Sequence, residues 1–272
     1  MKLSLVLSTQ PARFDAVAFK GDLAANFAKI AGWGYDGVEL AIRDPRLVDA
    51  EAIADLARGH GLAIPAIGTG QAWGEEGLSF TDPDPAIRDA AIARVHSHIP
   101  LAARFEAVII IGLLRGIVRP GLAPGQAMAL LVDALRQNCA AAAEQGVRIA
   151  LEPINRYETT LINTVAEGLE LIEKVGAQNL GLLLDTFHMN IEEPAIEASI
   201  AAAGDRIFHF HVADSNRWPP GGGHIDFRSV LDALFAAGYD GFVSGEFLPR
   251  PDADSAAGQA ITFLRSLSPF HD

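Results

Sequence analysis

The sequence predicts one (β/α)8 barrel over residues 1–272, in which strands and helices alternate eight times. Three observations support this fold class. A length of 272 residues is typical of a single barrel of this kind. Short β-type runs alternate with longer amphipathic stretches along the whole chain. The runs are apolar on both faces, as in the consecutive residues 108–111 (VIII), and a buried parallel sheet requires such strands.

Eight segments rich in β-branched and aliphatic residues are the expected strands: residues 3–8, 37–41, 63–68, 107–112, 148–154, 180–185, 207–213 and 241–246. Eight amphipathic segments are the expected helices: residues 23–31, 49–60, 85–103, 126–144, 165–175, 191–203, 227–237 and 254–267. A doubly wound open sheet is the alternative, but it usually has fewer strands and a glycine-rich phosphate loop after the first one. Here the three consecutive glycines, residues 221–223, follow the seventh strand and match no such loop.

The composition excludes several classes of partner. The chain has 34 acidic and 21 basic residues and a formal charge of −13, which disfavours binding to nucleic acid. No segment is long and uncharged enough to cross a membrane, and the apolar start of the chain is too short for a secretion signal. Cys139 has no second cysteine to pair with, so we expect a small buried residue in a protein of the reducing cytoplasm.

Four potential metal ligands end four successive strands. In a (β/α)8 barrel the C-terminal ends of the strands converge on one rim, where the chemistry takes place. Glu152, Asp185, His211 and Glu246 end strands five to eight, each about one βα unit of roughly 30 residues after the previous one. One such carboxylate alone would be read as a helix cap or as an arginine partner. Four in consecutive units predict a metal site, and we call them the acid–histidine cluster.

Three carboxylates and one imidazole suit a hard or borderline divalent cation. We expect one Mn²⁺, with Mg²⁺ and Co²⁺ as alternatives. Zinc also binds such ligands, but an oxygen-rich set without thiolate disfavours a structural zinc site. Four protein ligands would leave room for two substrate oxygens, as a Lewis-acid site requires.

Further polar residues follow the same strand ends. Glu158, His188 and Arg217 lie a few residues after members of the acid–histidine cluster, which makes them candidates for contacts around it. Arg43 and Arg115 follow strands two and four and are either contacts for an anionic substrate group or surface salt-bridge residues.

Two buried polar residues are expected deeper in the barrel. Glu39 ends the second strand, and we expect it to be buried against an arginine, with an approach to the pocket as the alternative. His209 lies two residues before His211, so both side chains point to the same face of the strand. We expect His209 to be a core histidine one layer below the rim.

Three stretches carry a resemblance to a known family: residues 151–158 (LEPINRYE), residues 184–193 (LDTFHMNIEE), and residues 209–211 (HFH) followed by 215–217 (SNR). They resemble the ketose 3-epimerases that act on tagatose and psicose, within the xylose-isomerase-like TIM barrel superfamily. These motifs span residues 148–250, and the βα alternation extends the likeness over the whole chain.

The resemblance implies a function and roles for individual residues. The acid–histidine cluster would bind the metal, and Glu152 and Glu246 would also exchange the substrate proton. Glu158, His188 and Arg217 would hold the carbonyl end of the substrate and its neighbouring hydroxyls. The enzyme would invert the carbon beside the ketone through a cis-enediolate. Relatives of this kind commonly form homo-oligomers, so we expect a dimer or a tetramer.

The N-terminal half is more similar to another branch of the superfamily, which is implicated in inositol breakdown and epimerises keto sugar acids such as 5-keto-gluconate and tagaturonate. The similar stretches are residues 41–45 (AIRDP), 68–72 (GTGQA) and 111–116 (IGLLRG). In that case Arg43 or Arg115 would contact the substrate carboxylate. An aldose–ketose isomerase such as hydroxypyruvate isomerase is an alternative with the same metal chemistry. An endonuclease IV-like phosphodiesterase is another, but the sequence shows neither its histidine-rich ligand set nor a basic groove.

Overall fold

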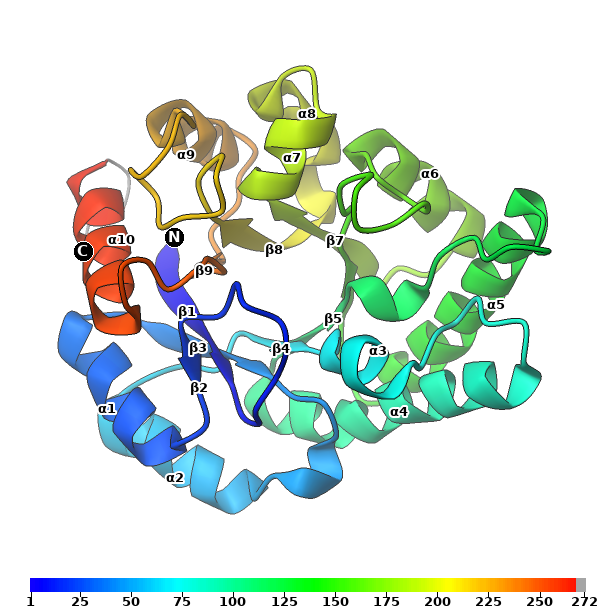
Figure 1. Ribbon diagram of the computed structural model, residues 1–272, viewed down its shortest axis with the longest axis horizontal. Coiled ribbons are helices and arrows are strands. Elements are labelled where there is room, and N and C mark those ends of the chain that lie inside the picture. The colour runs from blue at the N-terminus through cyan, green and yellow to red at the C-terminus, as the bar shows by residue number, and fades with distance from the viewer. Residues whose placement is uncertain (268–272) are drawn as a thin grey trace.

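A closed parallel barrel forms the centre of the computed structural model, which describes residues 1–267 (Figure 1). The strands follow one another around the barrel in chain order, and β9 pairs with β1 to close it. Their bounds are β1 Lys2–Ser8, β3 Gly37–Ala41, β4 Ala66–Gly68, β5 Val108–Ile111, β6 Ile149–Leu151, β7 Leu180–Asp185, β8 Ile207–Val212 and β9 Phe242–Gly245. The predicted (β/α)8 barrel is confirmed.

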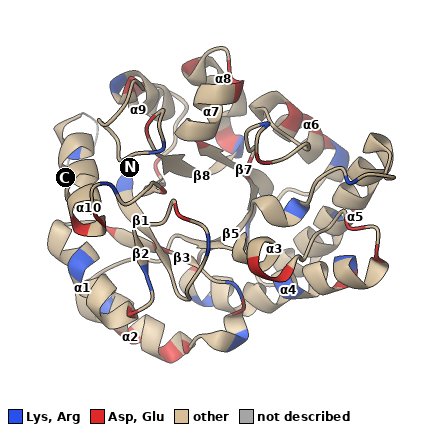
Figure 2. Cartoon of the chain, in the orientation of Figure 1, with Lys and Arg blue, Asp and Glu red and all other residues tan. Residues whose placement is uncertain are grey.

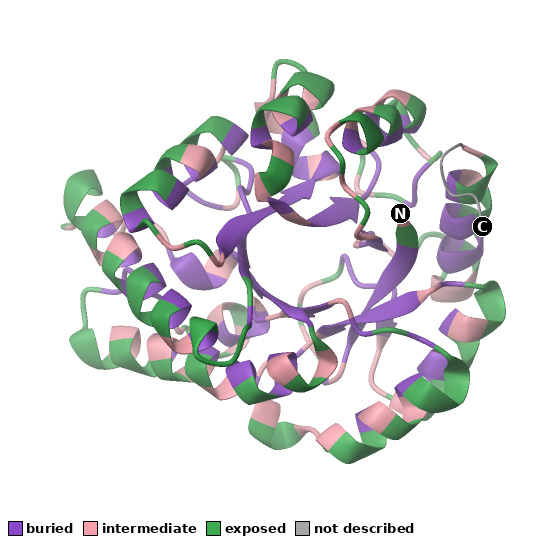
Figure 3. Ribbon diagram, turned by 180° about the vertical axis from the view of Figure 1, so that it is seen from behind, coloured by how far each residue is buried: buried purple, intermediate pink, exposed green. Residues whose placement is uncertain are grey.

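Helices cover the outside of the barrel and turn their exposed faces to solvent (Figure 3). They are α1 Leu23–Trp33, α2 Ala50–His60, α3 Gln71–Glu76, α4 Pro85–Phe105, α5 Pro124–Ala143, α6 Val165–Val175, α7 Thr186–Glu192, α8 Ile196–Ala203, α9 Phe227–Ala236 and α10 Ala253–Ser266. Acidic and basic residues are interspersed over these helices in the view of Figure 2. No helix among residues 1–267 is long and apolar enough to cross a membrane. The cytoplasmic location and the homo-oligomer stay predictions.

Several short elements were not predicted from the sequence. The two-residue strand β2 (Phe19–Lys20) pairs with the end of β1, and it is too short to show a hydrophobic period. Helix α3 has six residues, less than two turns, and is also too short to show a period. The expected helix over residues 191–203 forms only from Ile196 as α8, and its first two residues instead end the unpredicted helix α7. Pro194 separates the two helices because it lacks the N–H that a continuous helix needs.

The short helix α7 begins directly at the end of β7, where the predicted metal ligand Asp185 lies. It begins directly after Asp185, whose side chain accepts a hydrogen bond from the backbone N–H of Phe187 at 2.7 Å. Such a cap satisfies one of the free N–H groups at a helix start. The cap therefore explains why the chain turns into a helix immediately at the rim of the barrel.

The barrel has two hydrophobic layers. The larger one lies between the strands and the helices and includes the buried Cys139, as predicted. The smaller one fills part of the barrel interior, and its members, the apolar interior group, are Ala66, Val108, Ile110, Ala150 and Leu183.

The remaining strands place polar residues inside the barrel. Residues two apart in a strand point to the same side, and Val6, Glu39, His211 and Glu246 all line the cavity. The buried polar residues on this face of β1, β3, β8 and β9 are Ser4, Glu39, His209 and Ser244, which we call the polar interior group; Val6 is apolar. One half of the interior is therefore apolar and the other half mostly polar.

Candidate active site

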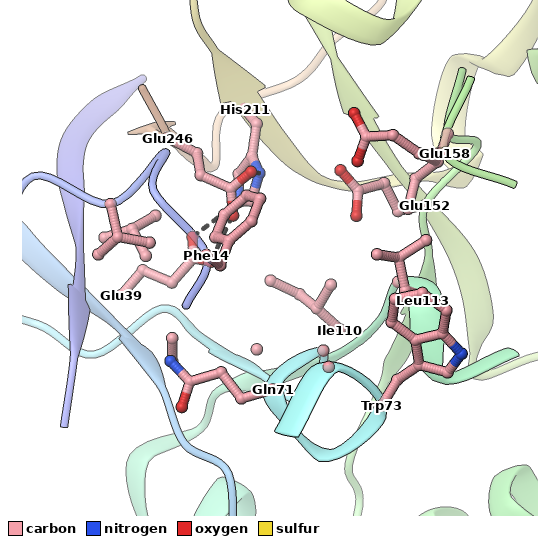
Figure 4. Close-up of a pocket in the computed structure, with 18 of the residues that line it drawn as sticks. Phe14, Glu39, Gln71, Trp73, Ile110, Leu113, Glu152, Glu158, His211 and Glu246 are labelled. Carbon is pink, nitrogen blue, oxygen red and sulfur yellow. Dashed lines mark hydrogen bonds and ion pairs between the residues drawn. The ribbon is translucent and has the colours of Figure 1, made fainter. Parts of the chain in front are cut away.

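The acid–histidine cluster comes together at the C-terminal rim of the barrel. One ligand atom from each of its four members lies within 4.8 Å of the others. Each member is held at the end of its strand, from β6 to β9, so the regular barrel geometry brings them to one place. In Figure 4, Glu246 and His211 project from one side of the cavity and Glu152 from the other.

Several members of the cluster are anchored through one atom and leave another without a partner. Asp185 caps α7 with Oδ1, while its Oδ2 has no hydrogen-bond partner. His211 contacts Glu39 through Nε2, while its Nδ1 has none. Glu152 Oε1 is also buried and unpartnered. Buried polar atoms without partners are costly, and a divalent cation among these three atoms would satisfy all of them. The residues present therefore fit a metal ion.

The pKa values of all four members of the acid–histidine cluster are raised in the metal-free protein, as expected for a site that lacks a cation. Burial, together with the charge of Glu246, raises the pKa of Glu152 well above its usual value. Burial raises the pKa of Asp185 and brings that of Glu246 to about 7. For His211, burial opposes protonation, but the Glu39 carboxylate outweighs it and raises the pKa to about 10. Protons thus neutralise the metal-free cluster, and a cation would displace them.

A second layer of polar residues contacts this cluster. Arg217 Nη1 lies 2.9 Å from Glu158 Oε1, and Arg217 Nη2 lies 3.5 Å from Glu246 Oε2. The guanidinium also lies 5.0 Å from the ring of Phe14 and 4.7 Å from that of Phe187. Stacking and ion pairing together hold the arginine in one orientation.

Asn155 sets the tautomer of His188. Its amide nitrogen donates to Glu158 Oε1 at 2.9 Å and lies 2.8 Å from His188 Nδ1. Because an amide N–H₂ only donates, His188 Nδ1 is the acceptor and the ring proton is on Nε2. Burial lowers the pKa of His188 well below its usual value, in keeping with a neutral ring. The Nε2–H group lies 3.6 Å from Glu152 Oε1 and lines the cavity.

The structure brings together all seven residues that the sequence analysis placed at the rim, but not the two arginines. Arg43 Nε lies 3.5 Å from Glu76 and is absent from the cavity wall. Arg115 has no exposed surface, so its interpretation as a surface salt-bridge residue is wrong; it donates to the backbone carbonyl of Glu152. Neither arginine lines the cavity, and their contact with a substrate carboxylate stays a prediction.

The expected partner of Glu39 is also wrong. Glu39 is buried against two histidines, His209 and His211, and not against an arginine. The spacing that placed both histidines on one strand face was visible in the sequence, but nothing in the sequence showed that β3 would face β8 across the barrel. His209 is buried one layer below His211, as predicted.

The sequence analysis missed several residues of the cavity wall. Phe14 comes from the loop between β1 and β2, and Gln71 and Trp73 come from α3 (Figure 4). Asn155, which contacts Glu158 and His188 behind the site, was also not identified. The loops and the short helix that carry these residues have no periodic pattern, so only their position in the fold identifies them.

Comparison with known proteins agrees with this geometry. A model of the xylose isomerase-like TIM barrel family matches residues 27–267. The L-ribulose 3-epimerase of Methylomonas sp. (strain DH-1) is 34% identical over 266 residues, which cover 94% of this chain and 90% of that protein. The crystal structure of D-psicose 3-epimerase with D-tagatose from Clostridium cellulolyticum H10 superposes with a TM-score of 0.84 and 26% identity, over 98% of this chain and 99% of that one.

A further relative acts at another carbon. The 3-dehydro-D-guloside 4-epimerase of Escherichia coli (strain K12) is 33% identical over 138 residues, which cover 50% of this chain and 53% of that protein. The relatives are carbohydrate epimerases by name, so the predicted enzyme class is confirmed. The chain therefore belongs to the xylose isomerase-like TIM barrel family.

Proposed function

We propose that this enzyme is a metal-dependent ketose epimerase that inverts the carbon beside the ketone through a cis-enediolate. One observation carries the proposal: four metal-type ligands converge at the barrel rim, and three of them carry a buried polar atom without a hydrogen-bond partner. The 3-epimerase and 4-epimerase relatives support the same class of reaction.

Glu152, Asp185, His211 and Glu246 would hold one divalent ion, which we propose to be Mn²⁺ because three of the four donors are carboxylates. The ion would polarise the carbonyl of the substrate and stabilise the negative charge that develops on its oxygen. Asp185 and His211 would serve only as ligands, because each is also fixed by a second hydrogen bond.

Glu152 and Glu246 would exchange the proton. They lie on opposite sides of the cavity (Figure 4), so each can reach one face of the planar intermediate. One carboxylate removes the proton from its face, and the other returns a proton to the opposite face. Both groups would also bind the metal, which lowers their basicity, so the hydrogen bonds around them help to set it.

Glu158, His188 and Arg217 would hold the substrate. Glu158 accepts from Asn155 and pairs with Arg217, so its carboxylate is fixed and can accept hydrogen bonds from sugar hydroxyls. Arg217 bridges Glu158 and Glu246 and thus connects the substrate contact to one of the proton-exchanging residues.

The charges along the cavity favour a neutral ketose over a keto sugar acid. Among residues 1–267, the arginines that line the cavity are Arg13 and Arg217. Arg217 is paired with two carboxylates, and Arg13 is largely exposed beside Glu75. Neither offers an unpaired cation to a substrate carboxylate. Much of the remaining wall is apolar and includes Val6, Trp73, Ile110, Leu113 and Ile154.

Proton exchange in D₂O tests this proposal. The purified protein is stripped with chelator, restored with Mn²⁺ and incubated in D₂O with ketohexoses and keto-hexonates, and the products are followed by NMR. We expect metal-dependent deuterium at the carbon next to the ketone, together with the epimer, and faster turnover of neutral ketoses. Faster turnover of keto-hexonates would reverse the substrate assignment. An aldose product would indicate an isomerase, and the lack of metal-dependent exchange on every substrate would contradict the proposed reaction.

A further inference from the structure

We propose that Glu39 is the positioning residue of the metal site, because it fixes which nitrogen of His211 faces the cation. The proposal rests on the metal-dependent function proposed above. Glu39 lies in β3, on the far side of the barrel from the cluster residues of β6 and β7, and is only 1% exposed. Nothing in its own strand indicates a role in metal binding.

The carboxylate of Glu39 contacts two imidazoles at once. Its Oε2 lies 2.7 Å from His209 Nε2, and both of its oxygens lie 3.0 Å from His211 Nε2. An ionised carboxylate only accepts hydrogen bonds, so both histidines carry a proton on Nε2. In neutral His211 the lone pair is then on Nδ1.

That lone pair points to the cluster. His211 Nδ1 lies 3.8 Å from Asp185 Oδ2 and 3.9 Å from Glu246 Oε2, and it has no hydrogen-bond partner. A half-turn of the ring about the Cβ–Cγ bond would exchange Nδ1 with a carbon and move Nε2 away from Glu39. The Glu39 contact therefore opposes the one rotation that would remove His211 from the ligand set.

His209 completes the arrangement. Its ring lies 5.4 Å from that of His211 at an interplanar angle of 80°, and it donates to the same carboxylate. Glu39 is thus held by a second donor and is not free to follow His211. Partners of this kind behind a metal-ligating histidine set its tautomer and orientation and raise its basicity.

An alternative is that Glu39, His209 and His211 hold a metal of their own, since their ligand atoms also lie within 4.8 Å of one another. In this group, however, the atoms that face each other are already paired by hydrogen bonds. The acid–histidine cluster contains three buried atoms without partners. The cation therefore belongs to the cluster, and Glu39 acts through His211.

Metal titration of variants tests the proposal. The full chain and its Glu39→Gln and Ser4→Ala variants are titrated with Mn²⁺ by calorimetry. Glutamine keeps the shape of the side chain but offers one acceptor oxygen in place of two, so we expect about 10- to 100-fold weaker Mn²⁺ binding. Ser4 is buried in the same half of the interior, and its hydroxyl has no partner. Ser4→Ala is the matched control and should bind Mn²⁺ as the wild type does.

A spectroscopic measurement separates positioning from general destabilisation. At saturating Co²⁺, Glu39→Gln should change the visible absorption of the bound ion, because the orientation of His211 changes, whereas Ser4→Ala should not. In ¹⁵N-labelled wild-type protein loaded with Mg²⁺, the nitrogen shifts should show the Nε2–H tautomer for both His209 and His211. This second measurement needs no variant to fold.

The outcomes are distinguishable. Wild-type Mn²⁺ affinity and an unchanged Co²⁺ spectrum in Glu39→Gln would overturn the positioning role while leaving the proposed function intact, as would an Nδ1–H tautomer of His211. Two ions per wild-type chain and one in Glu39→Gln would replace positioning by a second metal site. A wild-type chain that binds no Mn²⁺ would overturn the proposed metal site and this inference with it.

Discussion

The two halves of the barrel interior lie at the same depth and differ in chemistry. Strands β4 to β7 contribute the apolar interior group, which packs as a small core inside the barrel. Strands β1, β3, β8 and β9 contribute the polar interior group. The boundary is sharp, since Leu183 of the first group is paired in register with His209 of the second.

This chemical difference indicates that the apolar half of the interior mainly stabilises the fold, whereas the polar half serves the active site. Apolar side chains inside the barrel stabilise it by burial and packing, independently of any ligand. Buried polar side chains cost free energy unless they are paired, and here Glu39 is paired with both His209 and His211. We therefore expect substitutions in the apolar interior group to change stability, and substitutions of Glu39 or His211 to change metal binding and turnover.

The largest effect is expected for Glu246→Gln, because an amide cannot exchange the substrate proton. Turnover should fall by about 10²–10⁴-fold, while the circular dichroism spectrum stays that of the wild type. Epimerisation of the fastest ketose, followed by NMR, measures the loss. Glu173→Gln on the exposed side of α6 is the control and should keep full activity. Near-normal epimerisation by Glu246→Gln would contradict the two-carboxylate scheme.

Leu183→Ala should lower the stability of the protein and leave metal binding unchanged. Leu183 is fully buried in the apolar interior group, and the truncation should lower the free energy of unfolding by about 2–5 kcal/mol. Denaturant unfolding with and without Mn²⁺ gives this value, and calorimetry gives the Mn²⁺ affinity, which should be unchanged. A variant with normal stability and weakened metal binding would show that the two halves are not separate in function.

Removal of the metal should lower the free energy of unfolding by less than the upper value expected for Leu183→Ala. A ligand present at 100 times its Kd stabilises a protein by about 2.7 kcal/mol. For a chain of this size that corresponds to a Tm change of roughly 5–10 °C. Thermal melts before and after chelation, and after Mn²⁺ is restored, measure it. Equal Tm values in all three samples would argue that the cluster does not bind the ion.

The smallest effect is expected from pH. The pKa of His211 in the metal-free protein is about 10, against an ordinary value of 6.5. Between these values the folded state binds more protons than the unfolded state, so stability falls as pH rises. From pH 7 to 8.5 the metal-free protein should lose at most about 1.4 kcal/mol per pH unit from this group. Bound Mn²⁺ requires neutral His211 and should remove the contribution of His211 to this slope. His211→Gln should also remove it, and the part due to Glu152 and Glu246, whose pKa values burial raises, remains.

Much of this enzyme was predictable from local patterns. The alternation of β-type and amphipathic segments identified the eight βα units, and the rule that parallel strands end at one rim brought Glu152, Asp185, His211 and Glu246 together. This prediction needed no knowledge of the loops, because the barrel itself sets the position of each strand end.

Only the tertiary structure decided which side chains pair across the barrel. Glu39 and His211 are 172 residues apart, and no local pattern indicates that one carboxylate accepts from two histidines. The same holds for Arg115, which the fold buries behind Glu152, and for Phe14 and Trp73, which irregular loops and a short helix bring to the cavity. Strand periodicity specifies the face on which a side chain lies, but its partner depends on how the sheet closes.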